Sequence, residues 1–455
     1  MGHCAAMSAP PFGGLALKRG DRNAEMLSMA LPRLLPSLTA ILAVPALVVS
    51  LLVAGPLATS SSAGTSETGK VTKVIDGDTI AVNLTGGGGG SAIVRLVGID
   101  TPERDKCGYA AATKGLRSLV GRKTVVLRSD TGQTGLRGRP ERRVLVPAGG
   151  QTVDATTWML ERGLGVWMPR KGEITNSRAH HQAADRAAAA GLAWFDEDRC
   201  GAGPAPNGSL TMTVQWNADA TQRLSDGERR NQEFIRIRND GLIPVSLDGW
   251  TLRVGNDRSR LVPVGGPIGP GETVTIHVGY GTDSTYHRYL GSSVPMLQNA
   301  DLTGRDHLGS GSYLVDPHGD IRAHMTWPCT QTCADPTGGA LRLSHVQVDP
   351  PGQELYALNS EYVDVTNAGN VPVRTGDTVI EIWPWVYEFP GEHVLAPGET
   401  TRLYGGHGAD DRLSRYLDAV NPPLRNLAGQ VVLRTYDAVV LDCYSWGGGK
   451  CPHYG

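Results

Sequence analysis

Phenylalanine is scarce in this sequence, and its scarcity limits the classes of fold that the chain can adopt. The 455 residues include only four phenylalanines, against 59 glycines and 29 prolines. This composition is typical of turn-rich β structure and argues against a helical bundle. Because a domain typically has roughly 100 to 200 residues, the length predicts a multidomain protein and not a single core.

Residues 1–66 have the pattern of a targeting segment. Basic residues precede an apolar run from Leu34 to Gly55, and a stretch of small residues follows, with Ser61 and Ala63 in the small-x-small arrangement of a cleavage site. We predict a signal peptide and a secreted, extracellular protein. The apolar run is also long enough for a membrane anchor, so an outward-facing, membrane-anchored protein is the alternative if the segment is not cleaved.

Six cysteines lie downstream of this segment, and their even number in an exported chain predicts three disulfides. We expect each bond to stay within its own region, which pairs Cys107 with Cys200, Cys329 with Cys333, and Cys443 with Cys451. A metal site is the alternative for the CTQTC stretch. The oxidising compartment and the lack of a neighbouring histidine at ligand spacing disfavour it.

Net charge divides the rest of the chain into two halves. Residues 67–200 carry 20 Lys and Arg against 15 Asp and Glu, a formal charge of +5, whereas residues 201–455 carry 19 against 28, a formal −9. The Gly- and Pro-rich segment 201–208 is predicted to be the linker between them. The basic half is the candidate for binding a polyanion.

The basic half, residues 67–200, combines short β-rich runs with helical patterns. The five β-rich runs cover residues 70–75, 78–84, 92–99, 123–128 and 142–147. The helical patterns cover residues 109–121, 154–163 and 177–194. We therefore predict an α+β domain with an OB-like five-stranded barrel and helices on one side. His180 and His181 are expected to be solvent-exposed, and Trp158, Trp167 and Trp194 to pack in the interior.

The acidic half contains a diverged internal repeat of short alternating strands. Residues 233–254 correspond to residues 361–382, and a PGE turn follows in each copy. The first copy, around Trp250, resembles the lamin tail domain, an immunoglobulin-like β-sandwich, and the second resembles it more weakly. We predict two all-β immunoglobulin-like sandwiches, residues 209–335 and 339–455. Such motifs specify a fold and no chemistry, so binding or spacing is the expected role.

A candidate cation site lies at the start of the basic half. Asp76 and Asp78 flank Gly77 at a predicted strand entry, so that two carboxylates project near one point. Asp100 and the carbonyl oxygen of Thr101 would complete an all-oxygen ligand set, which hard cations such as Ca²⁺ prefer.

Phosphodiester hydrolysis needs a positioned water and neutralisation of the phosphate charge. Glu103 is the candidate to orient or deprotonate the water, and Arg95 is the candidate to hold the phosphate together with the cation. A second arginine is required on the opposite side of the phosphate. On a regular strand Arg95 and Asp100, five residues apart, would point to opposite faces. Gly98 between them predicts a bulge or bend that re-aims Asp100.

Taken together, VIDGDT (residues 74–79) and VRLVGIDTPE (residues 94–103) resemble the staphylococcal-nuclease-like, or thermonuclease, family. The resemblance covers residues 70–200 and implies an OB-like domain that hydrolyses DNA and RNA with Ca²⁺. It implies metal ligation by Asp78, Asp100 and the Thr101 carbonyl, a general base at Glu103, and a first catalytic arginine at Arg95.

The second catalytic arginine is assigned less directly by the same resemblance. The YGR motif of the family best fits the stretch RGRPERRV, which places the role on Arg139. Arg142 or Arg143 takes the role if the alignment of this loop shifts.

The sequence therefore predicts a secreted, Ca²⁺-dependent nuclease acting on DNA and RNA, with lamin-tail-like domains that bind a cell-surface or extracellular partner or act as spacers. The alternative is a non-catalytic secreted nucleic-acid-binding, adhesion or scaffold protein that uses the nuclease-like domain only for binding. A membrane contact is expected only if the N-terminal segment is retained.

Overall fold

The computed structural model describes residues 65–85, 89–129, 139–169, 175–201, 210–216, 231–255, 258–300, 309–330 and 333–452. Strands make up 41% and helices 12% of the structure, which confirms a β-rich protein. The predictions of a signal peptide or anchor and of a linker fall almost entirely outside these ranges. Within the ranges, the structure contains no helix with the length and apolar character needed to cross a membrane.

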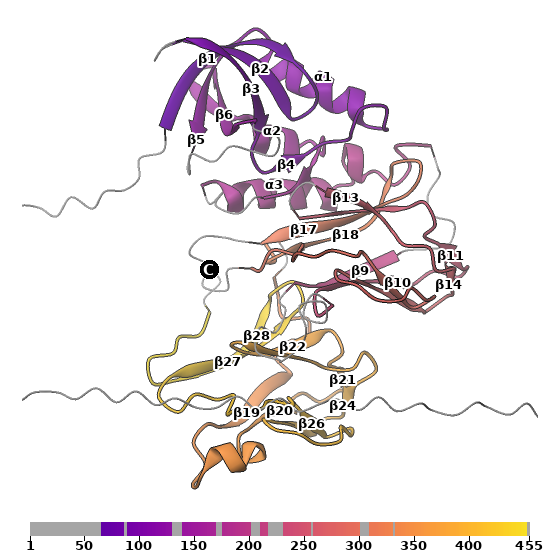
Figure 1. Cartoon of the computed structure of the whole chain (residues 1–455), viewed down its shortest axis with the longest axis vertical. Helices are drawn as coiled ribbons and strands as arrows, with labels where there is room; N and C mark the ends of the chain where they lie inside the picture. The colour runs from indigo at the N-terminus through magenta and orange to yellow at the C-terminus, as the bar shows by residue number, and fades with distance from the viewer. Residues whose placement is uncertain are drawn as a thin grey trace, which may run out of the picture. The chain divides into compact units, whose positions relative to one another are not determined.

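The N-terminal region (residues 65–201) is built on a sheet whose strands pair in the order β3-β2-β1-β5-β6-β7. Figure 1 labels the first five of these strands. A further parallel pairing joins β3 to β6, so five of the strands form a closed ring of pairings. The strand bounds are β1 Thr65–Val74, β2 Thr79–Leu84, β3 Gly90–Leu96, β5 Thr124–Ser129, β6 Glu141–Ala148 and β7 Gln151–Asp154. Alternate residues such as Ile80 and Val82 fill the interior, as the two-residue period of a strand requires.

Three helices pack against this sheet, close to their predicted positions. They are α1 Tyr109–Val120, α2 Ala155–Leu160 and α3 Ser177–Ala189. A 3₁₀ turn, η2 Ala193–Phe195, follows them, and the short strands β4 Ile99–Asp100 and β8 Val166–Trp167 pair with each other. Asp154 caps α2 by accepting a hydrogen bond from the Thr157 N–H at 3.1 Å.

The expectation that His180 and His181 are exposed is wrong, because both side chains are fully buried. Alanines give α3 a small buried surface that allows close packing, and both histidines lie on it. His180 Nε2 lies 3.2 Å from Asp154 Oδ1. The His181 ring stacks on the Trp167 ring with 3.8 Å between the ring centroids. Trp167 and Trp194 are buried as predicted, and the partly buried Trp158 packs against the core.

The first β region (residues 210–327) has two four-stranded sheets around one apolar core. One sheet consists of β9 Leu210–Gln215, β10 Phe234–Asn239, β15 Thr273–His277 and β16 His287–Tyr289. The other consists of β12 Thr251–Val254, β13 Arg258–Leu261, β17 Ser310–Val315 and β18 Ile321–Trp327. A short pair, β11 Val245–Ser246 and β14 Pro267–Ile268, completes the region. Trp250 is partly buried against the core.

The second β region (residues 341–446) repeats this pattern strand for strand. One sheet consists of β19 Leu341–Gln347, β20 Tyr362–Asn367, β25 Thr400–Tyr404 and β26 Ser414–Tyr416. The other consists of β22 Thr378–Ile382, β23 Trp385–Glu388, β27 Gly429–Thr435 and β28 Val440–Trp446, and the short pair is β21 Val373–Arg374 with β24 Val394–Leu395. Two 3₁₀ turns, η3 Glu354–Tyr356 and η4 Leu358–Ser360, precede β20.

A shared buried asparagine supports the predicted repeat at the level of single contacts. The Asn239 side-chain amide donates to the carbonyl oxygens of Ile243 and Ile268, at 2.7 and 2.9 Å. Asn367 makes the equivalent bonds in the second β region, at 2.8 and 2.9 Å. In both copies the asparagine fixes the turn after the second strand of its sheet.

The three disulfides have the predicted pairing, with Cα–Cα distances of 5.7 Å for Cys107–Cys200, 5.6 Å for Cys329–Cys333 and 5.8 Å for Cys443–Cys451. The metal-site alternative for CTQTC is therefore not needed, because the sulfur atoms of Cys329 and Cys333 are bonded to each other.

The N-terminal region and the first β region are in direct contact. A small apolar cluster joins Val166, Met168, Trp194 and Phe195 to Tyr313, Val315 and Ile321. Tyr313 donates its hydroxyl proton to the Trp167 carbonyl oxygen at 3.0 Å, and Trp194 Nε1 donates to the Gly319 carbonyl oxygen at 2.8 Å. The two regions are therefore not independent modules joined only by a linker.

Candidate functional site

The site begins at the turn between β1 and β2, which places Asp78. Gly77 allows this turn to lie against α1, since a Cβ atom there would be 2.7 Å from the Ala112 Cβ and 2.8 Å from the Thr101 Oγ1. Asp76 Oδ1 accepts a hydrogen bond from the Asp78 N–H at 3.2 Å, so Asp76 shapes the turn. The Asp78 side chain is thereby directed into a buried position, with 3% of the residue exposed.

Arg95 connects the two predicted metal carboxylates. It lies on β3 opposite Thr79 and is 8% exposed. Its Nη1 lies 2.8 Å from Asp78 Oδ1, and its Nη2 lies 3.0 Å from Asp100 Oδ1. The strand breaks between these residues at Gly98, whose φ of 79° is in the left-handed region that favours glycine. The bend therefore lets the Asp100 side chain reach the face from which Arg95 projects, and the two side chains form an ion pair.

Thr101 completes the environment of Asp78. Its N–H and its hydroxyl group both donate to Asp78 Oδ2, at 3.2 and 3.1 Å, and the Thr79 hydroxyl donates to Asp78 Oδ1 at 2.9 Å. With Arg95, four donors hold this carboxylate. The predicted ligand atom of Thr101, the carbonyl oxygen, belongs to the same buried residue.

Glu103 differs from these residues because its side chain is exposed. Within the described part of the chain it makes no side-chain hydrogen bond or ion pair. The structure thus places it three residues beyond Asp100 but does not bring its carboxylate into contact with the buried cluster. A solvent-facing position is compatible with a base that acts on water.

The register of β6 distinguishes the three candidate second arginines. The Arg95 N–H donates to the Pro140 carbonyl oxygen at 3.0 Å, and Arg95 pairs with Glu141. Because side chains alternate along a strand, an extended segment puts Arg139 and Arg143 on the same face as Arg95 and puts Arg142 on the opposite face.

Arg142 and Arg143 differ from Arg139 in that each forms an ion pair with a described carboxylate. Arg142 Nε lies 3.8 Å from Glu67, and Arg143 Nε lies 3.3 Å from Asp154. Arg139 is partly buried, and its Nε has no hydrogen-bond partner among the described residues. Arg139 is therefore the candidate that best combines the required face with an unsatisfied guanidinium donor.

Sequence reasoning missed one residue of the site, Arg253, which comes from β12 of the first β region. Its Nη1 forms an ion pair with Asp100 Oδ2, and the residue is 6% exposed. Its guanidinium carbon lies 4.9 Å from the centre of the Trp194 ring. Like Arg95, Arg253 interrupts an apolar strand, so the same sequence signal could have identified it as a residue with a buried partner.

The donor set matches the chemistry of a hard cation. Asp78 and Asp100 supply two charged oxygen ligands and the Thr101 carbonyl a neutral one, whereas Ca²⁺ takes six to eight oxygens. Substrate and water would therefore provide the rest. Among the described residues there is no cluster of three or more His, Cys, Asp or Glu side chains arranged to hold a metal. In the present arrangement two guanidinium groups balance the two carboxylates.

No family model matches the sequence, and no curated protein matches it either. The functional interpretation consequently depends on the geometry of the site and on the sequence motifs.

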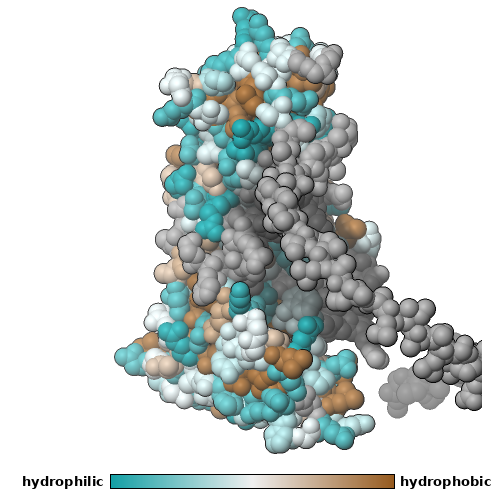
Figure 2. Space-filling view, turned by 90° about the vertical axis from the view of Figure 1, so that its left-hand side faces the viewer, coloured by the Kyte–Doolittle hydropathy of each residue, from teal (hydrophilic) through white to brown (hydrophobic). Residues whose placement is uncertain are grey.

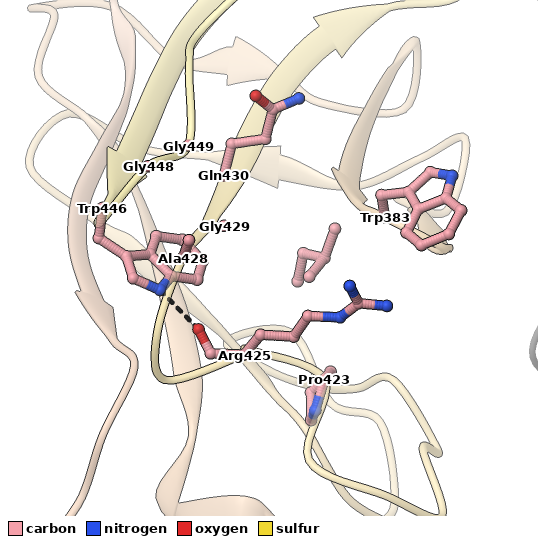
Figure 3. A pocket seen from close by; sticks show the side chains of 10 residues that line it. Trp383, Pro423, Arg425, Ala428, Gly429, Gln430, Trp446, Gly448 and Gly449 are labelled. Atoms are coloured by element: carbon pink, nitrogen blue, oxygen red, sulfur yellow. Dashed lines mark hydrogen bonds between the residues drawn. The ribbon is translucent and has the colours of Figure 1, made fainter. Parts of the chain in front are cut away.

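A separate surface pocket lies in the second β region, between the start of β27 and the end of β28. It has a volume of about 270 Å³ and is lined by Trp383, Arg425, Gln430 and Trp446 among others (Figure 3). The Arg425 guanidinium carbon lies 5.3 Å from the Trp383 ring centre, and Trp446 Nε1 donates to the Arg425 carbonyl oxygen at 2.6 Å.

This pocket contains none of the predicted catalytic residues. On the described part of the face seen in Figure 2, hydrophobic residues form small patches among hydrophilic ones. Scattered apolar residues of this kind are ordinary for a protein surface and identify no ligand.

Proposed function

We propose that the chain is a secreted, Ca²⁺-dependent nuclease that hydrolyses phosphodiester bonds of DNA and RNA. Its N-terminal region would be an OB-like, staphylococcal-nuclease-like domain, and its two β regions immunoglobulin-like, lamin-tail-like sandwiches that bind an extracellular partner or act as spacers. The observation that carries the proposal is the convergence of Asp78, Arg95 and Asp100, the residues that the two sequence motifs assign to one catalytic site.

Each residue has a role that follows from its position. Asp78, Asp100 and the Thr101 carbonyl would hold the cation, which neutralises phosphate charge when bound. Glu103, facing solvent, would orient a water and accept its proton. Arg95 and Arg139 would bind the phosphate oxygens, because a planar guanidinium meets two oxygens at once and stabilises the charge that develops in the transition state. The formal +5 charge of residues 67–200 would attract the polyanionic substrate.

The second candidate function is a non-catalytic nucleic-acid-binding or scaffold protein. The contact of Arg253 with Asp100 is the observation that favours it, since a guanidinium already neutralises a predicted metal ligand. A nuclease assay separates the two candidates.

The test uses purified residues 67–455 with double-stranded DNA, single-stranded DNA and RNA, in Ca²⁺ and in excess chelator. We expect cleavage only with Ca²⁺. Glu103→Gln should lower kcat by roughly 10² to 10⁴-fold with little change in substrate affinity, the usual contribution of a general base. Glu197→Gln is the matched control, because Glu197 is also exposed and belongs to the same region. Undiminished cleavage in chelator, or equal activity of the two variants, would refute the proposed mechanism.

A further test concerns the second arginine. Arg139→Ala should reduce kcat/KM by roughly 10² to 10³-fold, as loss of a transition-state donor does, whereas Arg142→Ala should have a mild effect. The opposite result would assign the role to Arg142.

A further inference from the structure

We propose that Arg253 is an autoinhibitory residue that competes with the catalytic cation for Asp100. The inference rests on the proposed function, because it assumes that Asp78 and Asp100 form a cation site. In the described structure the Asp100 carboxylate is shared by two guanidinium groups, Arg95 on Oδ1 and Arg253 on Oδ2. Arg95 belongs to the same region as Asp100, but Arg253 is supplied by the first β region.

Charge balance opposes the binding of a cation to Asp100 while Arg253 is paired with the same carboxylate. The two carboxylates and two guanidinium groups of the buried cluster sum to zero formal charge. A divalent cation at Asp100 would add two positive charges beside both arginines, and repulsion between charges a few ångströms apart is strong where water is excluded. A cation at Asp100 would also use the carboxylate that Arg253 occupies. Arg95 comes from the same region as both aspartates, whereas Arg253 is supplied by the first β region, so displacement of Arg253 leaves the N-terminal part of the site unchanged.

The contact is connected to the interface between the two regions. Arg253 on β12 pairs with Tyr313 on β17, and Tyr313 donates to the Trp167 carbonyl oxygen at 3.0 Å. Trp167 on β8 pairs in turn with Ile99, the residue before Asp100. The guanidinium of Arg253 is also 4.9 Å from the ring centre of Trp194. Loss of the Arg253–Asp100 pair should therefore loosen the contacts around Trp167, which would open the predicted catalytic carboxylates to substrate.

The first experiment measures Ca²⁺ binding by calorimetry to residues 67–455 and to its Arg253→Met variant, without nucleic acid. Methionine keeps much of the apolar stem and removes the charge. We expect the variant to bind Ca²⁺ at least ~10-fold more tightly, since the competing charged hydrogen bond is gone. Arg288→Met is the matched control. Arg288 is fully buried in the same β region and donates to the carbonyl oxygens of Pro263 and Gly266, so its loss should leave Ca²⁺ affinity unchanged.

Asp100→Asn locates the binding site, because it should abolish Ca²⁺ binding both alone and combined with Arg253→Met. Equal affinity of the wild type and Arg253→Met would overturn the inference, and if both cleave DNA the proposed function stands without it. Tighter Ca²⁺ binding by Arg253→Met without cleavage by either protein would support competition and refute the nuclease. Absence of Ca²⁺ binding in all variants would refute the cation site and the competition together.

A second measurement requires no variant. Amide hydrogen exchange of the wild type, with and without saturating Ca²⁺, reports on the segments around Val166–Trp167 and Ser310–Val315. We expect faster exchange in both segments with Ca²⁺, because the interface loosens as Arg253 leaves. Unchanged or slower exchange at a Ca²⁺ concentration that saturates binding would contradict displacement of Arg253.

Discussion

Replacing Arg95 by methionine tests the buried charge cluster without relying on catalysis. Arg95 contacts both carboxylates, at 2.8 Å to Asp78 and 3.0 Å to Asp100. The two aspartates are 3% and 2% exposed, so water cannot replace the lost partner. Removal of one partner of a buried ion pair typically costs about 3–5 kcal/mol.

The structure favours the lower end of this range. Asp78 keeps three other donors, from Thr79 and Thr101, and Asp100 keeps Arg253. We therefore expect Arg95→Met to lower the free energy of unfolding by about 3 kcal/mol in the absence of divalent cation. The assay is urea unfolding of residues 67–455, followed by tryptophan fluorescence, because Trp167 and Trp194 belong to the N-terminal region.

Calcium should reduce this deficit. A ligand at ~100 times its Kd stabilises the folded state by about 2.7 kcal/mol, and a cation between the two carboxylates replaces the missing positive charge. Arg142→Met is the control, because Arg142 lies on the adjacent β6 and its partner Glu67 is 46% exposed at 3.8 Å. This variant should cost less than about 1 kcal/mol and show no Ca²⁺ rescue. A loss below about 1 kcal/mol for Arg95→Met would refute the buried pairing. A deficit unchanged by Ca²⁺ would refute the cation site.

Three further predictions concern single residues. Burial raises the pKa of Asp154, but the hydrogen bond and charge of His180 and other neighbours lower it to about 2. The ionised Asp154 carboxylate contributes about 2 kcal/mol to the free energy of unfolding above pH ~4, and this contribution is lost as the pH falls through 2. Asp154→Asn should therefore lose less stability than the wild type on acidification. Thermal unfolding between pH 2 and 5 measures the difference. Burial raises the pKa of Glu233 to about 7, so its stabilising effect is present below pH ~4.5 and lost as the pH rises through 7. Glu233→Gln should therefore raise Tm relative to the wild type more at pH 8 than at pH 5. A larger rise at pH 5 than at pH 8 would refute the raised pKa of Glu233. Gly98→Ala, with φ at 79°, should cost about 1 kcal/mol or more and weaken Ca²⁺ binding through Asp100, which calorimetry would detect.

The secondary structure of the N-terminal region was predictable from local signals. The run of β-branched residues at 78–84 became β2 Thr79–Leu84, and the pattern at 109–121 became α1 Tyr109–Val120. Short strands without a pattern, such as β7 Gln151–Asp154, were not predicted, because four residues carry too little periodicity. The tertiary environment of α3 was also missed. Its polar composition indicated an exposed helix, but its histidines found a carboxylate and an indole ring as partners.

The candidate site was predictable only where its residues are close in sequence. Asp78, Arg95 and Asp100 fall within 23 residues, and Gly98 explained how the last two could meet. Arg253 is 153 residues from Asp100, so no spacing argument could connect them. The interface that brings them together depends on apolar residues such as Trp194 and Tyr313, which any core would also contain.

An arginine inside an apolar strand predicts a buried partner and does not by itself predict catalysis. Arg434 on β27 is fully buried and pairs with Glu381 at 2.9 Å, while the fully buried Arg288 on β16 donates to the carbonyl oxygens of Pro263 and Gly266. In these cases each guanidinium satisfies a local structural need. Arg95 differs because it joins two carboxylates at the point where its strand breaks, and the second carboxylate is also held by an arginine from another region. Arg322 on β18 likewise pairs with two buried carboxylates, Asp316 at 2.7 Å and Asp320 at 3.6 Å, so two carboxylates on one guanidinium do not by themselves identify a cation site. The function of this cluster therefore depends on whether a cation can displace Arg253 from Asp100.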